Sequence, residues 1–185
     1  MVIADRLKKS NRAEYLLYMW QVEDVVRAYR CDAERLTREY VSRFDLDEAQ
    51  HEATAQWYAD ICAMMHSEGV TEKGHIQLCK NILQELAELH EQLLTSPHFP
   101  YYREMYYHVL PYIVELRSKR RKEADDAPDE SELETCFNVL YGIMMLRLQG
   151  KEIVQATQKA VKDITTMLGQ LSDYYFKDKE KPLEF

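Results

Sequence analysis

A twelve-residue apolar run, FNVLYGIMMLRL at 137–148, constrains the fold of this chain more than any other segment. Its apolar residues surround most of a helix circumference, and only Asn138, Gly142 and Arg147 interrupt them. Such a helix must be covered by neighbours on several sides. We therefore expect a bundle with this helix at its centre, in which Gly142 lets a neighbour approach closely and an enclosed Arg147 needs a carboxylate partner.

The composition favours helices and a single domain. A chain of 185 residues with 46% hydrophobic content can build one substantial core. Five Gly and five Pro leave little material for the turns of an all-β or doubly wound fold. We predict an all-α, up-and-down bundle of six or seven helices over residues 1–176, with 133–148 at its centre and a polar tail at 177–185.

Capping residues predict several helix starts. Three pairs have capping-box spacing, namely Asn11 with Glu14, Asp47 with Gln50 and Ser131 with Glu134. Asp32 is a further cap, for a helix that reaches Phe44. Because no Gly or Pro occurs between Met1 and Gly69, one long bent helix over the first 44 residues remains an alternative.

Glycine and proline predict the remaining boundaries. Gly69 is placed to end one helix, and Thr71 can begin the next, which runs to about Thr95. Pro100 suits the first position of a helix that continues to about Lys122 and should bend at Pro111. The segment 123–130 is the one clear linker, and Gly150 separates the last two helices.

The net charge argues against polyanionic partners. The chain has 32 acidic and 24 basic residues, a formal charge of −8, which opposes attraction to phosphate backbones or anionic lipids. The basic run at 117–122 ends a helix, and the acids from Glu123 to Glu134 precede the next one, so both complement helix dipoles. We expect neither a nucleic-acid nor a membrane partner.

Cysteine usage and the amino terminus indicate a cytoplasmic protein. No signal peptide is evident, and no stretch reaches membrane-spanning length. The four cysteines are scattered without a CxxC pair, which favours free reduced thiols over disulfides or a zinc site; they are Cys31, Cys62, Cys79 and Cys136.

The first long helix has two apolar faces. One carries Tyr15, Tyr18, Met19, Val22, Val25, Val26 and Tyr29. The other carries Leu16, Leu17 and Trp20. Two apolar faces need two partners, so we expect Leu16, Leu17 and Trp20 to contact a second layer of helices or to form a subunit interface.

A buried charge pair is a candidate at the central helix. Asp24 or Glu23 could approach Arg147, and the alternative is that Arg147 extends its charged head into water. The candidate pocket or buried polar cluster comprises Trp20, Asp24, His75, Tyr102 and Arg147. His75 and His90 fall near the apolar face of the helix from Thr71, where a satisfied core histidine is more common than a ligand or a base.

Other constellations give weak signals. Glu48 and His51 form an ExxH, and Glu104 and His108 lie four residues apart, but a di-iron bundle needs a second ExxH and two further inward carboxylates. We therefore predict no metal and no cofactor. The tyrosines of the helix from Pro100 favour packing or an interface over a small-molecule site; they are Tyr101, Tyr102, Tyr106, Tyr107 and Tyr112.

Two segments carry a resemblance to a known family. They are NRAEYLLYMWQVEDVVRAY at 11–29 and LRLQGKEIVQAT at 146–157. They resemble a family of uncharacterised bacterial helical proteins, known only as a domain of unknown function, over the whole chain. The resemblance implies an all-helical cytoplasmic protein, and it brings no activity, cofactor or catalytic residue to this sequence.

Two classes of function remain. The first is a noncatalytic interaction protein or homo-oligomeric scaffold, which uses the Leu16, Leu17 and Trp20 face or the Tyr-rich helix. The second is a small-molecule-binding or metal-dependent bundle enzyme with the five-residue pocket named above. The sequence leaves open whether the chain is an enzyme. A dry core with an apolar surface would favour the first class, and a polar cavity at the central helix the second.

Overall fold

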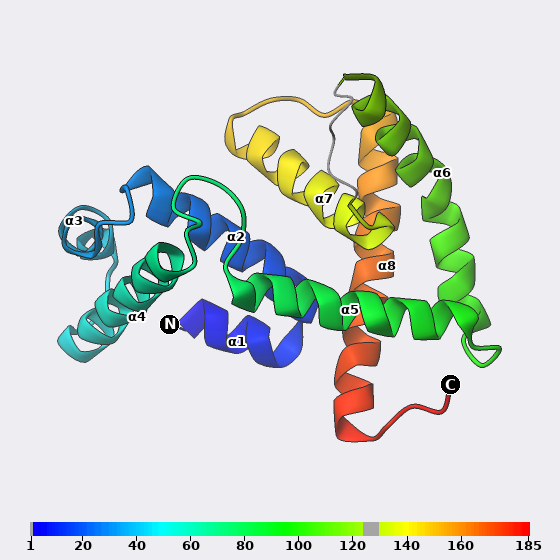
Figure 1. Ribbon diagram of the computed structural model, residues 1–185, viewed down its shortest axis with the longest axis horizontal. Helices are drawn as coiled ribbons and strands as arrows, with labels where there is room; N and C mark the ends of the chain where they lie inside the picture. The colour runs from blue at the N-terminus through cyan, green and yellow to red at the C-terminus, as the bar shows by residue number, and fades with distance from the viewer. Residues whose placement is uncertain (1, 124–129) are drawn as a thin grey trace. The chain divides into compact units, whose positions relative to one another are not determined.

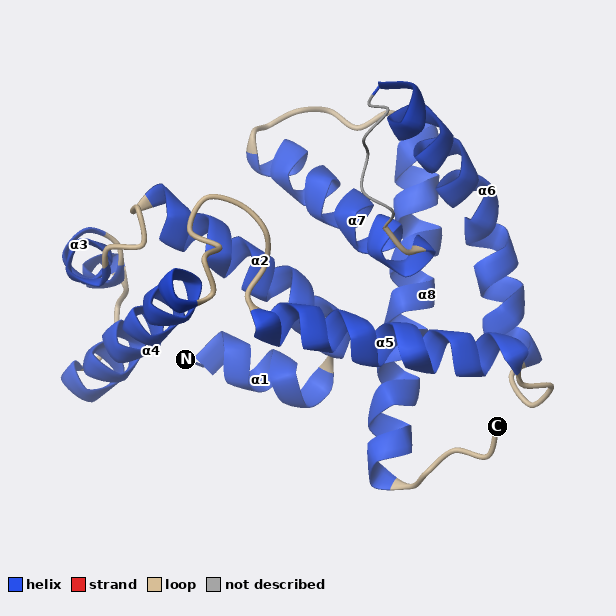
Figure 2. Cartoon of the chain, in the orientation of Figure 1, coloured by secondary structure: helices blue, strands red, loops and turns tan. Residues whose placement is uncertain are grey.

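The computed structural model describes residues 2–123 and 130–185 of the chain. Throughout these residues the regular structure is helical, with eight α-helices and one 3₁₀ turn joined by loops (Figure 2). The predicted all-α class is confirmed. The predicted linker at 123–130 falls mostly on 124–129, which lie outside the described residues.

The chain divides into two compact units, residues 1–84 and residues 85–185, and each is described by itself. Helix α5 (Gln77–Thr95) contributes its first turns to unit 1 and its remaining turns to unit 2. The single domain over residues 1–176 stays a prediction.

Unit 1 is built around helix α2. Besides the first turns of α5, its elements are α1 (Val2–Ser10), α2 (Arg12–Ala28), α3 (Ala33–Glu39), the 3₁₀ turn η1 (Val41–Arg43) and α4 (Glu48–Ser67). Helix α2 packs against α1 and α4, and α3 packs against α4 (Figure 1). Both predicted faces of α2 contribute to the core, since Tyr15 and Met19 are buried together with Leu16 and Trp20.

Helix starts follow the predicted caps. Each capping side chain accepts a hydrogen bond from the backbone N–H three residues on, at 3.0 Å for Asn11, 2.9 Å for Asp32, 2.8 Å for Asp47 and 3.1 Å for Ser131. The first 44 residues are separate helices and not one bent helix. Arg30 and Cys31 have φ of 60° and 53°, and this left-handed backbone ends the helical path after α2.

The predicted start of α5 at Thr71 is wrong. Residues 70–76 form a loop, and the helix begins at Gln77. Gly74 has φ of +86°, a conformation that a continuing helix excludes. Two carboxylates fix the true start, because Glu23 accepts from the backbone N–H of Ile76 and Glu68 accepts from that of Gln77.

Unit 2 contains α6 (Pro100–Glu123), α7 (Glu132–Leu148) and α8 (Gln155–Glu180). Helix α6 packs against α8, and α7 packs against both. Pro111 lies exposed within α6, and the ribbon of α6 bends along its length, as predicted (Figure 1). Helix α8 continues through the first residues of the segment predicted as a tail, as far as Glu180.

The predicted central position of α7 is not confirmed. Buried residues occupy its first turns only, at Leu133, Thr135, Cys136 and Phe137. Leu148, at its end, is 71% exposed. A Cβ added at Gly142 would meet no atom within 4 Å among the described residues, so the expected close approach of a neighbour is wrong. In α2, by contrast, buried residues come from both of its predicted apolar faces and occur along most of the helix.

Candidate functional site

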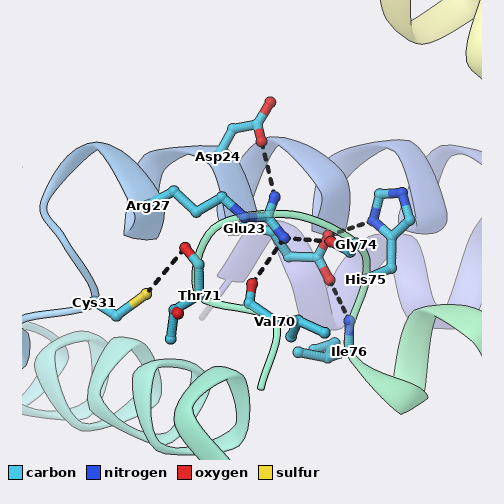
Figure 3. Close-up of polar contacts among 9 residues, drawn as sticks. All are labelled: Glu23, Asp24, Arg27, Cys31, Val70, Thr71, Gly74, His75 and Ile76. Carbon is cyan, nitrogen blue, oxygen red and sulfur yellow. Dashed lines mark hydrogen bonds and ion pairs between the residues drawn. The ribbon is translucent and has the colours of Figure 1, made fainter. Parts of the chain in front are cut away.

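The most unusual residue of unit 1 is Glu23, a carboxylate on the buried face of α2 with no solvent exposure. A buried carboxylate is costly unless donors surround it. Both oxygens of Glu23 have such donors in the loop before α5 (Figure 3). Oε1 accepts from the backbone N–H of Ile76 at 2.8 Å, and Oε2 lies 2.5 Å from Nδ1 of His75. The amino terminus of α5 adds a favourable dipole.

The thiol of Cys79 is a third partner of Glu23. Burial, and then the negative charge of Glu23 and a hydrogen bond to it, raise the pKa of Cys79 well above its ordinary value. Cys79 therefore stays a protonated thiol, which is a poor nucleophile. All four cysteines are free and buried.

His75 is held on two sides. Its ring stacks on the indole of Trp20, with centroids 4.4 Å apart and an interplanar angle of 16°. Glu23 fixes Nδ1, while Nε2 has no hydrogen-bond partner among the described residues. The side chain is 35% exposed. An imidazole positioned in this way can exchange a proton or contact a ligand through Nε2.

Arg27, one turn after Glu23, fixes the same loop from its other end. Its Nη1 lies 3.0 Å from Oδ1 of Asp24. Its Nη2 donates to the backbone carbonyl of Val70 at 3.2 Å and to that of Gly74 (Figure 3). We call Glu23, Arg27 and the loop 70–76 the Glu23 clamp. It joins α2 to the start of α5 with charge-assisted hydrogen bonds.

Further contacts hold the end of α2 beside this loop. The Sγ of Cys31 lies 4.0 Å from the carbonyl oxygen of Thr71 (Figure 3). Nε2 of His66 lies 3.1 Å from the carbonyl oxygen of Cys31. Side chains of α2 and of Cys31 therefore contact the backbone of the loop at Val70, Thr71, Gly74 and Ile76.

The structure brings together three of the five predicted cluster residues. Trp20, Asp24 and His75 all belong to the clamp or contact it. Tyr102 and Arg147 belong to unit 2, where Tyr102 is fully buried and Arg147 is exposed. Glu23, which the sequence offered as a partner for Arg147, has its oxygens on His75 and Ile76.

Tyr102 has a local partner in unit 2, His90 of α5. The Tyr102 hydroxyl lies 2.6 Å from Nδ1 of His90. Burial raises the pKa of Tyr102 well above its ordinary value. Burial also lowers the pKa of His90 to about 4, against a smaller opposite effect of Glu132. Tyr102 therefore donates to a neutral His90, and this pair is a satisfied core contact.

The predicted interface triplet is largely inside the chain. Leu16 is fully buried, Trp20 is buried and Leu17 is half-buried. For Leu16 and Trp20 the burial agrees with the expected contact to further helices of the same chain, and the alternative of an exposed subunit interface is wrong for these two residues.

The metal-type motifs do not gather further ligands. In the part of the chain that the structure describes, no group of three or more His, Cys, Asp or Glu side chains could hold a metal ion. Glu104 and His108 line a hollow of about 210 Å³ with Asp163 of α8. None of the described helices has the length and apolar character needed to cross a bilayer.

Sequence reasoning missed Arg27 and the 70–76 loop. The available signal was an acid at position 23 within a run of buried positions, since Trp20, Val22 and Val26 surround it in the helix. Nearly every residue has a backbone N–H, so the sequence does not indicate that the one of Ile76 is the donor.

The fold and the clamp define an all-helical protein whose buried carboxylate joins two helices through a loop. The family model described as Domain of unknown function (DUF4924) matches residues 1–182. The chain belongs to this family, and the resemblance expected from 11–29 and 146–157 is confirmed. No curated protein matches the chain, and no solved structure matches it.

Proposed function

We propose that this chain is a noncatalytic interaction scaffold that docks a protein on the outer face of α6. The observation that carries the proposal is an exposed apolar stripe. Tyr107, Pro111 and Val114 follow one another at helical spacing, and Tyr107 and Val114 are 60% and 58% exposed. We call these three residues the outer stripe.

The outer stripe makes α6 apolar on two sides. Tyr102, Val109 and Ile113 of the same helix are buried in unit 2. Single exposed apolar residues are ordinary, but an aligned set with an aromatic member is typical of a protein interface. Of the two candidate interfaces that the sequence offered, the Tyr-rich helix therefore supports the proposal, because the Leu16 and Trp20 side chains are buried.

The Glu23 clamp supports a noncatalytic role. Both oxygens of Glu23 and a terminal nitrogen of Arg27 bond to groups of the chain itself. Polar groups that are satisfied internally fix a helix start, whereas a catalytic group must reach a substrate.

The test compares the full chain with its Tyr107→Glu variant in native extract of the source cells, by size exclusion with antibody detection. The wild type is expected to elute at an apparent mass well above that of the monomer. Tyr107→Glu is expected to elute as a monomer, because a charge in an apolar interface is costly. Ile3→Glu, at a 44% exposed residue of α1, is the matched control and should behave as wild type. A wild-type chain that elutes as a monomer contradicts the proposal.

A small-molecule site at His75 is the second candidate. The observation that favours it is the imidazole held by Glu23 and Trp20 with Nε2 unengaged among the described residues. A thermal-shift screen of metabolites against wild type and His75→Gln tests it. A compound that stabilises only the wild type favours this candidate, and equal shifts in both proteins contradict it.

A further inference from the structure

Unit 1 has an apolar pocket that is separate from the Glu23 clamp. Its walls come from α1, from the loop between η1 and α4, and from the first turns of α4, and its volume is about 340 Å³. Phe44, Leu46 and Ala53 contribute to its apolar lining. An apolar cavity of about 150 Å³ is enough to hold benzene, so this pocket has room for a larger molecule. Pockets that bind small molecules are typically apolar with a few polar groups that fix the orientation of the ligand.

One buried polar side chain lines the pocket and has no partner within the described chain. Thr54 of α4 is 6% exposed, and its hydroxyl has no hydrogen-bond partner among the described residues. By contrast, Thr37, Thr95 and Thr166 each donate to the backbone carbonyl four residues earlier in their helices, at 2.9 Å. A buried hydroxyl without a partner costs free energy that a valine of the same shape would avoid. The hydroxyl of Thr54 is therefore available to an occupant of the pocket.

The polar residues of the pocket restrict the chemistry of that occupant. Asp5 of α1 and Gln50 of α4 are exposed and line the pocket together with the buried Thr54. The carboxylate of Asp5 repels an anionic group. A charged group of either sign placed against the buried Thr54 would lose its hydration. The lining therefore suits an uncharged apolar molecule with a hydroxyl, which can donate to Thr54 or accept from it.

We propose that this pocket binds a small apolar alcohol. The apolar body of the ligand lies against Phe44, Leu46 and Ala53, and its hydroxyl forms a hydrogen bond with Thr54. The lining residues belong to unit 1, whereas the outer stripe belongs to unit 2. The inference therefore goes beyond the proposed function and does not depend on it.

Isothermal titration calorimetry of the purified full chain with 1-octanol tests this. The wild type is expected to bind one octanol per chain, and to bind octanoate, the corresponding carboxylate, at least about tenfold more weakly. Ala53→Phe places a large side chain in the pocket and should abolish binding. Thr54→Val keeps the shape of the side chain but removes the hydrogen bond, so it should weaken octanol binding about threefold to tenfold.

Two matched controls make the same substitutions outside this pocket. Ala63→Phe lies at an exposed position of α4, and Thr37→Val removes a hydroxyl that already bonds to a carbonyl of its own helix. Both should bind octanol as the wild type does, and circular dichroism of each variant establishes that it is folded.

Three results would each overturn the inference. They are a wild type that binds no octanol, octanoate that binds as tightly as octanol, and a folded Ala53→Phe or Thr54→Val variant that binds octanol as tightly as the wild type. If Ala53→Phe does not fold, the comparison of octanol with octanoate and of the wild type with Thr54→Val still decides. None of these results bears on docking at α6, which is tested separately.

Discussion

The carboxylate of Glu23 accepts the backbone N–H of Ile76 at 2.8 Å, one residue before α5 begins. Because that carboxylate is fully buried in α2, the start of one helix is set by a side chain of another. Fifty-three positions separate the two residues in the chain.

Removing this carboxylate should destabilise unit 1. Glu23→Ala leaves the N–H of Ile76 without its acceptor and opens a cavity, so the free energy of unfolding should fall by about 2–4 kcal/mol. Urea denaturation measures the change. Asp24→Ala is the control, because that carboxylate is half-exposed and its pair with Arg27 contributes about 1 kcal/mol or less. Equal losses in the two variants would mean that the contacts of Glu23 stabilise unit 1 no more than the half-exposed pair of Asp24 and Arg27 does.

The pair of His90 and Tyr102 should make stability depend on pH. The folded-state pKa of His90 is about 4, below the ordinary value of 6.5, because burial disfavours its charged form. The unfolded chain therefore binds a proton first as the pH falls. The contribution is fully present above pH 6.5 and is lost progressively toward pH 4, by up to about 3 kcal/mol.

The measurement is the free energy of unfolding of wild type and His90→Gln from pH 7.5 to pH 4.5. Gln can still accept from the Tyr102 hydroxyl but does not titrate. Wild type should lose more stability than His90→Gln over this interval. Parallel pH profiles would rule out the titration of His90 as the cause.

Substitution by alanine at two glycines should change the stability of the fold in opposite directions. Gly74→Ala places a side chain at φ of +86° in the clamp loop and should cost about 1–2 kcal/mol. Gly142→Ala lies within α7 with open space around its Cβ among the described residues, and it should gain about 0.5–1 kcal/mol from helix propensity. Thermal unfolding measures both. A loss at Gly142 would indicate that a neighbour does approach there.

Local chemistry was readable from the sequence, and contacts between distant residues were not. Asn11, Asp32, Asp47 and Ser131 cap helices as predicted, because a cap needs only a backbone N–H three residues away. The start of α5 was misplaced by six residues, from Thr71 to Gln77, because it depends on Glu23 and Glu68 in other helices.

Which residues are buried was harder to predict from the sequence than which residues are helical. The apolar content of 137–148 suggested a central helix, yet α2 is the helix with two buried faces. Hydrophobicity tells which side chains avoid water, but it does not tell whether the same chain covers them. Of the five residues predicted to form one pocket, Trp20 and His75 stack on each other and Asp24 pairs with Arg27, whereas Tyr102 pairs with His90 in unit 2.

The most direct measurement of the central claim is photo-crosslinking in the source cells from position 107. Benzoylphenylalanine replaces Tyr107 in one sample and Ile3 in the other, so that both probes are exposed and only one lies on the outer stripe. The proposed function predicts a discrete protein adduct from position 107 and none from position 3. Equal labelling from both positions, or none from position 107, would contradict docking on α6.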